Sequence, residues 1–257
     1  GCDVWVIGHQ MNNNKFVAYL LTNTGLITTP ILSFVGESYS SLPADEEYIG
    51  YLKASPDGSR IANAKYHNAF EVFSFNNNTG NLALLYTIPQ VGQPNGWTYG
   101  VEFSPDGKRL YGSYGTGNDN TPCLFQWDLT AGNQAAVIAS KTDLYTYSIA
   151  NGTTLNPRAM QMASDGKIYV AIDGGSSIGL IDNPNALGIS CNFIPNAVVL
   201  PAPTGSGIGL PNFAPYLFAP QKPTISGPLN VCISTSGIYT ASVSCQEPYW
   251  EWTSNGG

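Results

Sequence analysis

One short pattern occurs three times along the chain, and it limits the available folds more than any other feature. In each copy, a stretch of alternating apolar residues leads into an Asp-Gly turn, and a second alternating stretch follows the turn. The copies are Tyr51–Ala62, Val101–Tyr111 and Met160–Val170. Glycine supplies the positive φ that a tight turn requires, so each copy predicts a β-hairpin.

Two more strand-like runs follow each hairpin, which makes a repeating unit of four strands. Repeated units of four short antiparallel strands are typical of β-propeller blades. We therefore predict an all-β fold with four-stranded blades at residues 1–36, 48–90, 98–140 and 157–200, and a closing strand at residues 209–219. The third blade is expected to end with a strand at Ala136–Ala139. The first blade begins at its second strand, so we expect further blades upstream of Gly1 in a larger ring.

Charge and composition exclude two classes of function. The chain of 257 residues carries 10 Lys and Arg against 17 Asp and Glu, a formal net charge of −7. Nucleic-acid binding requires a basic surface that neutralises phosphates, and this chain has too few cations to supply one. No apolar run approaches the roughly 18 residues that cross a bilayer as a helix, so we expect no membrane-spanning segment.

The composition changes at Pro220, where a proline-rich stretch reads as a stiff linker. Strand-like runs follow at Ile225–Cys232, Gly237–Val243 and Tyr249–Thr253. A tryptophan on the third strand is typical of an immunoglobulin-like sandwich, in which it packs between the two sheets. We therefore expect residues 220–257 to contain the linker and an incomplete Ig-type domain.

The five cysteines include no Cys-x-x-Cys pair. Cys232 and Cys245 flank a predicted strand, and they either form a local disulfide or are both free. Because the count is odd, at least one cysteine stays unpaired within the chain. Cysteines in a chain that is poor in charge and rich in Asn, Thr, Ser and Gly favour an exported protein.

Several segments together resemble a known family. They are Gly1–His9, Asn14–Gly25, Lys53–Gly58, Gly100–Gly107, Asp165–Val170, Ile181–Asn185 and Gly209–Phe213. As a set they resemble the propeller of large secreted cell-surface proteins of Bacteroidota, which are typically cargo of type IX secretion. The resemblance implies an extracellular location, two or three blades before Gly1, and a PKD-like domain that begins near Ile225. It implies no catalytic residues.

Ligands of propellers bind at the mouth of the central channel, which the first strands of the blades and their preceding loops surround. Six residues are our candidates for ligand binding there: Lys53, Trp97, Tyr99, Glu102, Arg158 and Asn212. Tyr48 and Gln161 occupy related positions. A carboxylate, a guanidinium and aromatic rings around a cup suit a polar or carbohydrate-like ligand. In the alternative interpretation, Glu102 and Arg158 form ion pairs with neighbouring blades or face water in the channel.

Metal and cofactor sites have little support. His9 and His67 occupy corresponding positions in two blades, but the sequence offers no third ligand beside them. The Asp-Gly pairs are explained by turn chemistry, and the chain contains no Gly-x-Ser-x-Gly nucleophile elbow. We expect no metal, no cofactor and no catalytic set.

These observations favour a non-enzymatic structural or recognition module of a large secreted surface protein. Its expected partners are other protein domains of the same or an associated surface assembly, or glycans. One alternative is a propeller enzyme, lactonase-like or acting on polysaccharides, that uses the channel mouth. Another is a subunit of an extracellular assembly such as a filament.

Overall fold

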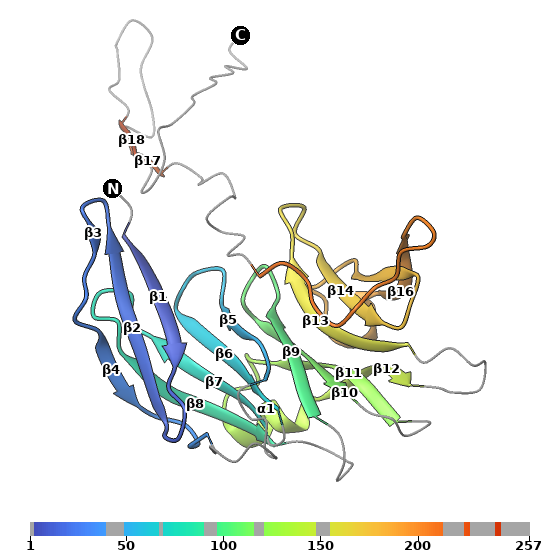
Figure 1. Ribbon diagram of the computed structural model, residues 1–257, viewed down its shortest axis with the longest axis horizontal. Coiled ribbons are helices and arrows are strands. Elements are labelled where there is room, and N and C mark those ends of the chain that lie inside the picture. The colour runs from blue at the N-terminus through green and yellow to red at the C-terminus, as the bar shows by residue number, and fades with distance from the viewer. Residues whose placement is uncertain are drawn as a thin grey trace, which may run out of the picture.

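The computed structural model describes residues 3–39, 49–66, 69–89, 97–115, 121–147 and 155–212, together with two short strands at 224–226 and 240–242. Four antiparallel sheets of four strands each form most of this part of the chain. The predicted all-β fold with four-stranded propeller blades is confirmed. The sheets follow one another in chain order, from the first in blue to the fourth in orange (Figure 1).

Each sheet is built from consecutive strands. The first sheet contains β1 (Val4–His9), β2 (Lys15–Thr22), β3 (Gly25–Leu26) and β4 (Ile31–Phe34). The second contains β5 (Leu52–Ala54), β6 (Arg60–Lys65), β7 (Ala69–Phe75) and β8 (Leu82–Pro89). The third contains β9 (Trp97–Phe103), β10 (Arg109–Gly115), β11 (Thr121–Asp128) and β12 (Thr142–Tyr147). The fourth contains β13 (Asn156–Met162), β14 (Ile168–Asp173), β15 (Ser177–Ile181) and β16 (Phe193–Val199).

The first sheet differs from the other three. Both β3 and β4 pair with β2, so the outer strand of this sheet is divided into two pieces. Among the described residues, no strand pairs with the free edge of β1.

The three repeated hairpins form as their sequences predict. The turn glycines Gly58, Gly107 and Gly166 have φ values of 67°, 69° and 75°. In each turn, the aspartate Oδ1 accepts a hydrogen bond of 3.0 to 3.1 Å from the backbone N–H two residues later. This local bonding fixes the turn, and the turn sets the register of the strands on either side.

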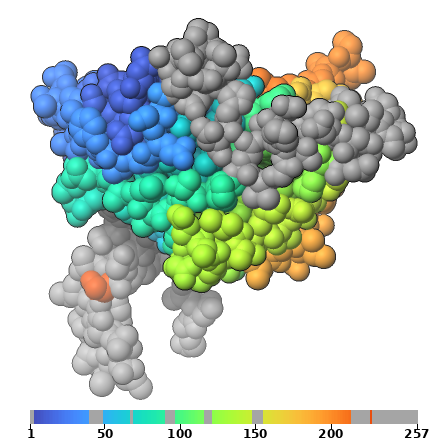
Figure 2. All heavy atoms as spheres, turned by 90° about the horizontal axis from the view of Figure 1, so that it is seen from below, coloured from blue at the N-terminus to red at the C-terminus, as the bar shows by residue number. Residues whose placement is uncertain are grey.

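The cores lie between consecutive sheets, since each sheet presents apolar side chains on both faces. Phe16 of the first sheet packs with Ile61 and Phe73 of the second. Val101 and Trp127 of the third sheet pack against the second sheet. A further cluster joins the third and fourth sheets, and its members include Tyr111, Leu124, Met160, Ile168, Val170 and Cys191. Seen from below, the first three sheets again lie side by side in chain order (Figure 2).

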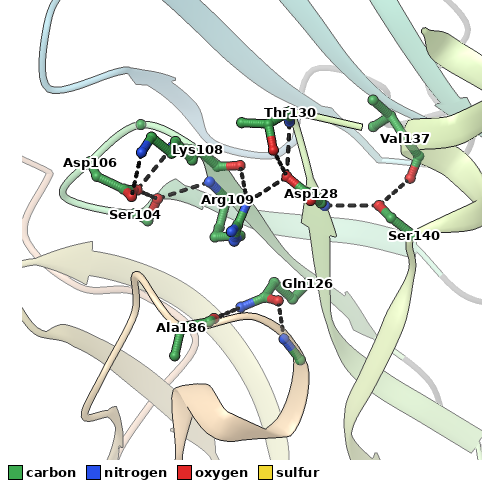
Figure 3. Close-up of polar contacts among 12 residues, drawn as sticks. Ser104, Asp106, Lys108, Arg109, Gln126, Asp128, Thr130, Val137, Ser140 and Ala186 are labelled. Atoms are coloured by element: carbon green, nitrogen blue, oxygen red, sulfur yellow. Dashed lines mark hydrogen bonds and ion pairs between the residues drawn. The ribbon is translucent and has the colours of Figure 1, made fainter. Parts of the chain in front are cut away.

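The strand that we predicted at Ala136–Ala139 is wrong, because this segment belongs to a helix. Helix α1 spans Gln134–Ala139, and Asn133 caps it by accepting a hydrogen bond of 3.0 Å from the Ala136 N–H on its side-chain oxygen. The fourth strand of this sheet is β12, which lies beyond the predicted limit at residue 140. Ser140 ties the helix to β11, because its Oγ accepts from the Asp128 N–H and donates to the Val137 carbonyl (Figure 3).

After β16 the chain returns to the inner strands. The Ala159 N–H donates to the Ile208 carbonyl at 3.1 Å, and the Tyr51 hydroxyl donates to the Leu210 carbonyl at 3.0 Å. This segment therefore links the fourth sheet to the second. Of the predicted closing strand at residues 209–219, residues 209–212 are described, and they are not in a strand.

Little of the predicted Ig-type domain is described. Strands β17 (Thr224–Ser226) and β18 (Thr240–Ser242) pair antiparallel, and they overlap the first two runs expected there. Cys232, Cys245 and the third run at Tyr249–Thr253 lie outside the described residues. The linker, the Ig-type domain and the local disulfide stay predictions. No helix in the described part of the chain is long and apolar enough to cross a membrane.

Candidate functional site

The first strands of the second, third and fourth sheets form the inner edge of the molecule, defined here as β5, β9 and β13. Each of these strands runs into one of the repeated turns, or into its equivalent. Lys53, Glu102 and Gln161 occupy the same place on the three strands, two residues before the turn begins. Because equivalent positions of neighbouring blades face the same axis, these three side chains converge.

The three side chains are directly bonded to one another. Lys53 Nζ lies 3.3 Å from Glu102 Oε2 and donates to Gln161 Oε1 at 2.7 Å. Backbone N–H groups hold the carboxylate from two strands, since Glu102 Oε1 accepts from Phe103 at 3.0 Å and Oε2 accepts from Met162 at 3.1 Å. The exposed fractions of Lys53, Glu102 and Gln161 are only 5%, 2% and 4%. We call Lys53 and Glu102 the channel pair.

Burial changes the proton affinity of both members of the channel pair. It raises the pKa of the Glu102 carboxyl, and it lowers the pKa of the Lys53 ammonium. In each case the charge of the partner offsets part of the effect. Desolvation thus brings the two pKa values closer together, a pattern that is frequent at sites of acid and base chemistry.

A second group of side chains lies where β9 and β13 begin. Arg158 Nη2 donates to Asp173 Oδ2 at 3.4 Å, and the guanidinium lies over the Trp97 ring at 5.3 Å from its centroid. The Arg158 side chain is 9% exposed, whereas the Asp173 side chain is 37% exposed. We call Trp97, Tyr99, Arg158 and Asp173 the mouth cluster.

Aromatic rings surround this group. Trp97 stacks on Tyr66, with ring centroids 5.7 Å apart and an angle of 26° between the rings. Tyr99 meets Tyr51 edge to face at 5.6 Å, and burial raises the pKa of the Tyr99 hydroxyl. The Tyr51 ring in turn lies 5.4 Å from Lys53 Nζ. Tyr51 and Tyr99 therefore connect the mouth cluster with the channel pair.

The structure brings five of the six candidate ligand-binding residues into these two groups. Lys53 and Glu102 form the channel pair, and Trp97, Tyr99 and Arg158 belong to the mouth cluster. Asn212 is exposed, and no described contact joins it to either group. Tyr48 lies outside the described residues.

Sequence reasoning missed two of the contributors. Asp173 ends β14, and Tyr66 follows β6, so both come from the second strand of a blade or from just beyond it. A signal existed for Asp173, because the hairpin pairs it with Asn156 at the start of β13. The prediction considered only the first strands of the blades, whereas the second strand of the same hairpin brings Asp173 back to the channel mouth.

The two histidines do not form a described metal site. His9 stacks on Tyr39 with ring centroids 3.8 Å apart, and burial lowers its pKa to about 4. His67 lies outside the described residues. Within the described ranges, no group of three or more His, Cys, Asp and Glu side chains could hold a metal ion. The two cysteines described there, Cys123 and Cys191, are buried and free.

The solved structures that are similar to this chain include proteins named as lactonases and lyases. The chain matches no protein-family model and no curated protein sequence. It is similar to a periplasmic gluconolactonase from Pseudomonas aeruginosa, at 15% identity and a TM-score of 0.48, over 93% of this chain and 62% of that one. It is also similar to a Bacteroides uniformis protein described as a 6-phosphogluconolactonase, at 16% identity and a TM-score of 0.47. That match covers 76% of this chain and 52% of the other. A virginiamycin B lyase from Staphylococcus aureus matches at 16% identity and a TM-score of 0.39, over 75% of this chain and 50% of the lyase chain.

The chain thus spans between half and two thirds of the length of these structures. The expectation of a non-enzymatic structural or recognition module is contradicted, since the neighbours named above are two lactonases and a lyase. At such identities the likeness shows the fold alone. The chemistry must therefore be argued from the residues of this chain.

Proposed function

We propose that the chain belongs to a β-propeller enzyme that hydrolyses cyclic esters, as a lactonase does, at the inner edge beside the channel pair. The observation that carries the proposal is the geometry of that pair. An ammonium and a carboxylate lie 3.3 Å apart on two different blades, and both are buried. Ester hydrolysis needs a base for the attacking water and an acid for the leaving oxygen, and the pair supplies both.

Stability alone does not account for the channel pair. Moving two charges out of water costs several kcal/mol per ion, and a well-packed apolar pair of similar size is often as stable. Here the cost falls on residues at the axis of the blades, where ligands of propellers bind. Opposite pKa shifts at such a position favour a role in proton transfer.

In the proposed reaction, Glu102 acts as the general base. Its carboxylate takes a proton from a water molecule, and the oxygen of that water attacks the ester carbonyl carbon. The N–H groups of Phe103 and Met162 hold the carboxylate in place for this step. A pKa above the ordinary value makes Glu102 a stronger base than an exposed glutamate.

Lys53 acts at the ring oxygen of the lactone, which is the leaving oxygen of the ester. Its ammonium stabilises the negative charge of the tetrahedral intermediate and donates a proton to the ring oxygen as the C–O bond breaks. Gln161 Oε1 accepts from Lys53 and fixes its direction. The products are a hydroxyl group and a carboxylic acid, and the proton on Glu102 returns to Lys53 across the 3.3 Å contact.

We place this enzyme outside the cytoplasm. Support comes from the scarcity of charged residues, 11% of the chain, and from the cysteine content. Its expected partners are a small polar ester and other domains of the same surface protein.

The test is a ring-opening assay of the full chain on a panel of hydroxylated lactones, beginning with glucono-δ-lactone, followed by the acid released. Glu102→Gln and Lys53→Met should each lower kcat by about 100-fold or more, the usual contribution of general acid or base catalysis. Lys108→Met is the matched control, because the Lys108 side chain is 60% exposed and lies at a turn.

Two results would contradict the proposal. One is a wild-type chain that opens no lactone of the panel faster than buffer does. The other is a folded Glu102→Gln variant with the wild-type rate.

A further inference from the structure

We infer that the mouth cluster is an anion-binding subsite, and that Arg158 binds a carboxylate or phosphate group of the ligand. The inference rests on the proposed function for the identity of the ligand as a substrate, but its geometry is independent of the channel pair.

Two of the nitrogen donors of the Arg158 guanidinium are unsatisfied. Nε and Nη1 are buried, and neither has a hydrogen-bond acceptor among the described residues. The one described carboxylate beside it is Asp173, which Nη2 meets at 3.4 Å, a long contact for a charge-assisted hydrogen bond. A guanidinium stays charged in proteins, so burying it with two donors unsatisfied is costly. An oxyanion that accepts from these donors would remove much of that cost.

The surrounding packing holds the guanidinium in this position. The Trp97 ring lies 5.3 Å from the guanidinium carbon and covers one side of it. Gly115 lies on another side, where a Cβ atom would collide with Arg158 Nη1 and with the Trp97 indole nitrogen. The close approach of Arg158 to the end of β10 therefore depends on the missing side chain at residue 115.

Both strands of the mouth cluster are irregular at this level. The pairing of β13 with β14 shifts between Pro157 and Met160, so Arg158 lies within a bulge. The pairing of β9 with β10 shifts between Gly112 and Tyr114. Bulges re-aim side chains and are frequent beside active sites. In a regular strand without this bulge, the side chain of Arg158 would point in a different direction relative to the side chain of Gln161.

The spacing along β13 limits the size of the ligand. Arg158 and Gln161 are three residues apart, which corresponds to roughly 10 Å in an extended strand and less across a bulge. A single sugar-sized ring, with its anionic group at one end and its ester carbonyl at the other, spans such a gap. The class of substrate is therefore a hydroxylated lactone of one ring that carries a carboxylate or phosphate.

The experiment measures equilibrium binding to the full chain by calorimetry, with three probes: inorganic phosphate, glucuronate and glucose. Phosphate and glucuronate are the anionic probes, and glucose is the neutral counterpart of glucuronate. We expect at least one anion to bind at least tenfold more tightly than glucose. The comparison of phosphate with glucuronate shows which anion the site prefers.

Arg158→Met should weaken binding of the preferred anion at least tenfold, and Arg158→Lys should weaken it less. Lys108→Met, which also removes one positive charge but from an exposed side chain, should leave the affinity for the anion unchanged. Circular dichroism establishes that each variant is folded. If Arg158→Met does not fold, the comparison of Arg158→Lys with Lys108→Met decides the result.

The inference fails if the anions bind no more tightly than glucose, or if folded Arg158 variants bind them as the wild type does. Glu102→Gln separates this inference from the proposed function, because it should lower kcat by about 100-fold or more and leave anion binding intact. Arg158-dependent anion binding in a chain without lactonase activity would overturn the proposed function and support the subsite.

Discussion

Replacement of Lys53 by methionine tests the channel pair through stability alone. Methionine keeps most of the volume of the side chain and removes its charge. The Glu102 carboxylate, which is 2% exposed, then keeps, among the described residues, only the N–H groups of Phe103 and Met162 as partners. Gln161 Oε1 also loses the donor that lies 2.7 Å away. Removing one partner from a buried ion pair costs about 3 to 5 kcal/mol. For a chain of this size, that loss corresponds to a fall in Tm of roughly 6 to 20 °C.

The double variant Lys53→Met/Glu102→Gln distinguishes a coupled pair from two separate contributions. It leaves no uncompensated charge, and the glutamine oxygen still accepts from one of the two backbone N–H groups. The other N–H loses its acceptor, which costs about 1 to 3 kcal/mol. The double variant should therefore be more stable than Lys53→Met alone by about 2 kcal/mol. Separate contributions would instead add.

Urea denaturation of the wild type, both single variants and the double variant at pH 7 gives the four free energies of unfolding. The reasoning is refuted if Lys53→Met costs less than about 1 kcal/mol, since an uncompensated buried carboxylate is then absent. It is also refuted if the double variant is the least stable of the four.

Three further predictions concern other parts of the molecule. Burial lowers the pKa of His9 from 6.5 to about 4, so the unfolded chain binds more protons between these values, and stability should fall by roughly 1 to 2 kcal/mol as the pH drops from 6.5 to 4. Urea midpoints across this range measure the fall, and His9→Phe should remove it. Gly112→Ala should cost about 1 to 3 kcal/mol, because its Cβ would lie 2.7 Å from the Phe70 ring, whereas Gly207→Ala, with no atom within 4 Å, should be neutral in the same assay. Burial raises the pKa of Cys123 to about 12, so iodoacetamide at pH 8 should spare this thiol until urea unfolds the chain, and rapid labelling of the folded protein, read by mass spectrometry, would contradict this.

The part of the fold that could be predicted from the sequence is the part that local chemistry fixes. An Asp-Gly turn depends on residues two positions apart, such as Asp57 and Ser59, and it sets the register of both strands that it joins. The alignment of Lys53 with Glu102 follows from the same turns, because a residue two positions before a turn keeps its place in every blade. For this reason the sequence indicated which side chains share the inner edge.

Helix α1 could not be predicted in this way. Ala136–Ala139 is a short apolar run, and periodicity does not separate a short buried strand from one turn of helix. The deciding features are the cap at Asn133 and the high helix propensity of glutamine and alanine at the start of the segment. The cap is a single residue in a stretch where the repeat had already suggested a strand.

The contacts of the mouth cluster depend on distances that no repeat encodes. Arg158 contacts Trp97 of the preceding blade and Asp173 of its own hairpin, and the strands β9 and β13 that carry Trp97 and Arg158 both have bulges. A bulge adds one residue to one strand, so counting back from the turn gives the wrong facing for residues beyond it. The turn-proximal channel pair was therefore easier to place than the mouth cluster.

The bonds of the channel pair also bear on how the sheets are held together. Lys53 is on the second sheet, Glu102 on the third, and Gln161 and the Met162 N–H on the fourth, so three hydrogen-bonded contacts join three blades at one point. A site of this kind forms only when the sheets are docked, unlike a site on a single loop. Other hydrogen bonds also cross these interfaces, such as the one from Gln126 Nε2 to the Ala186 carbonyl. The apolar contacts between the sheets, as at Val101 and Met160, fix the distance between sheets without selecting one sliding position. The directional bonds at the inner edge contribute to selecting that position, and they hold the Lys53 ammonium 3.3 Å from the Glu102 carboxylate.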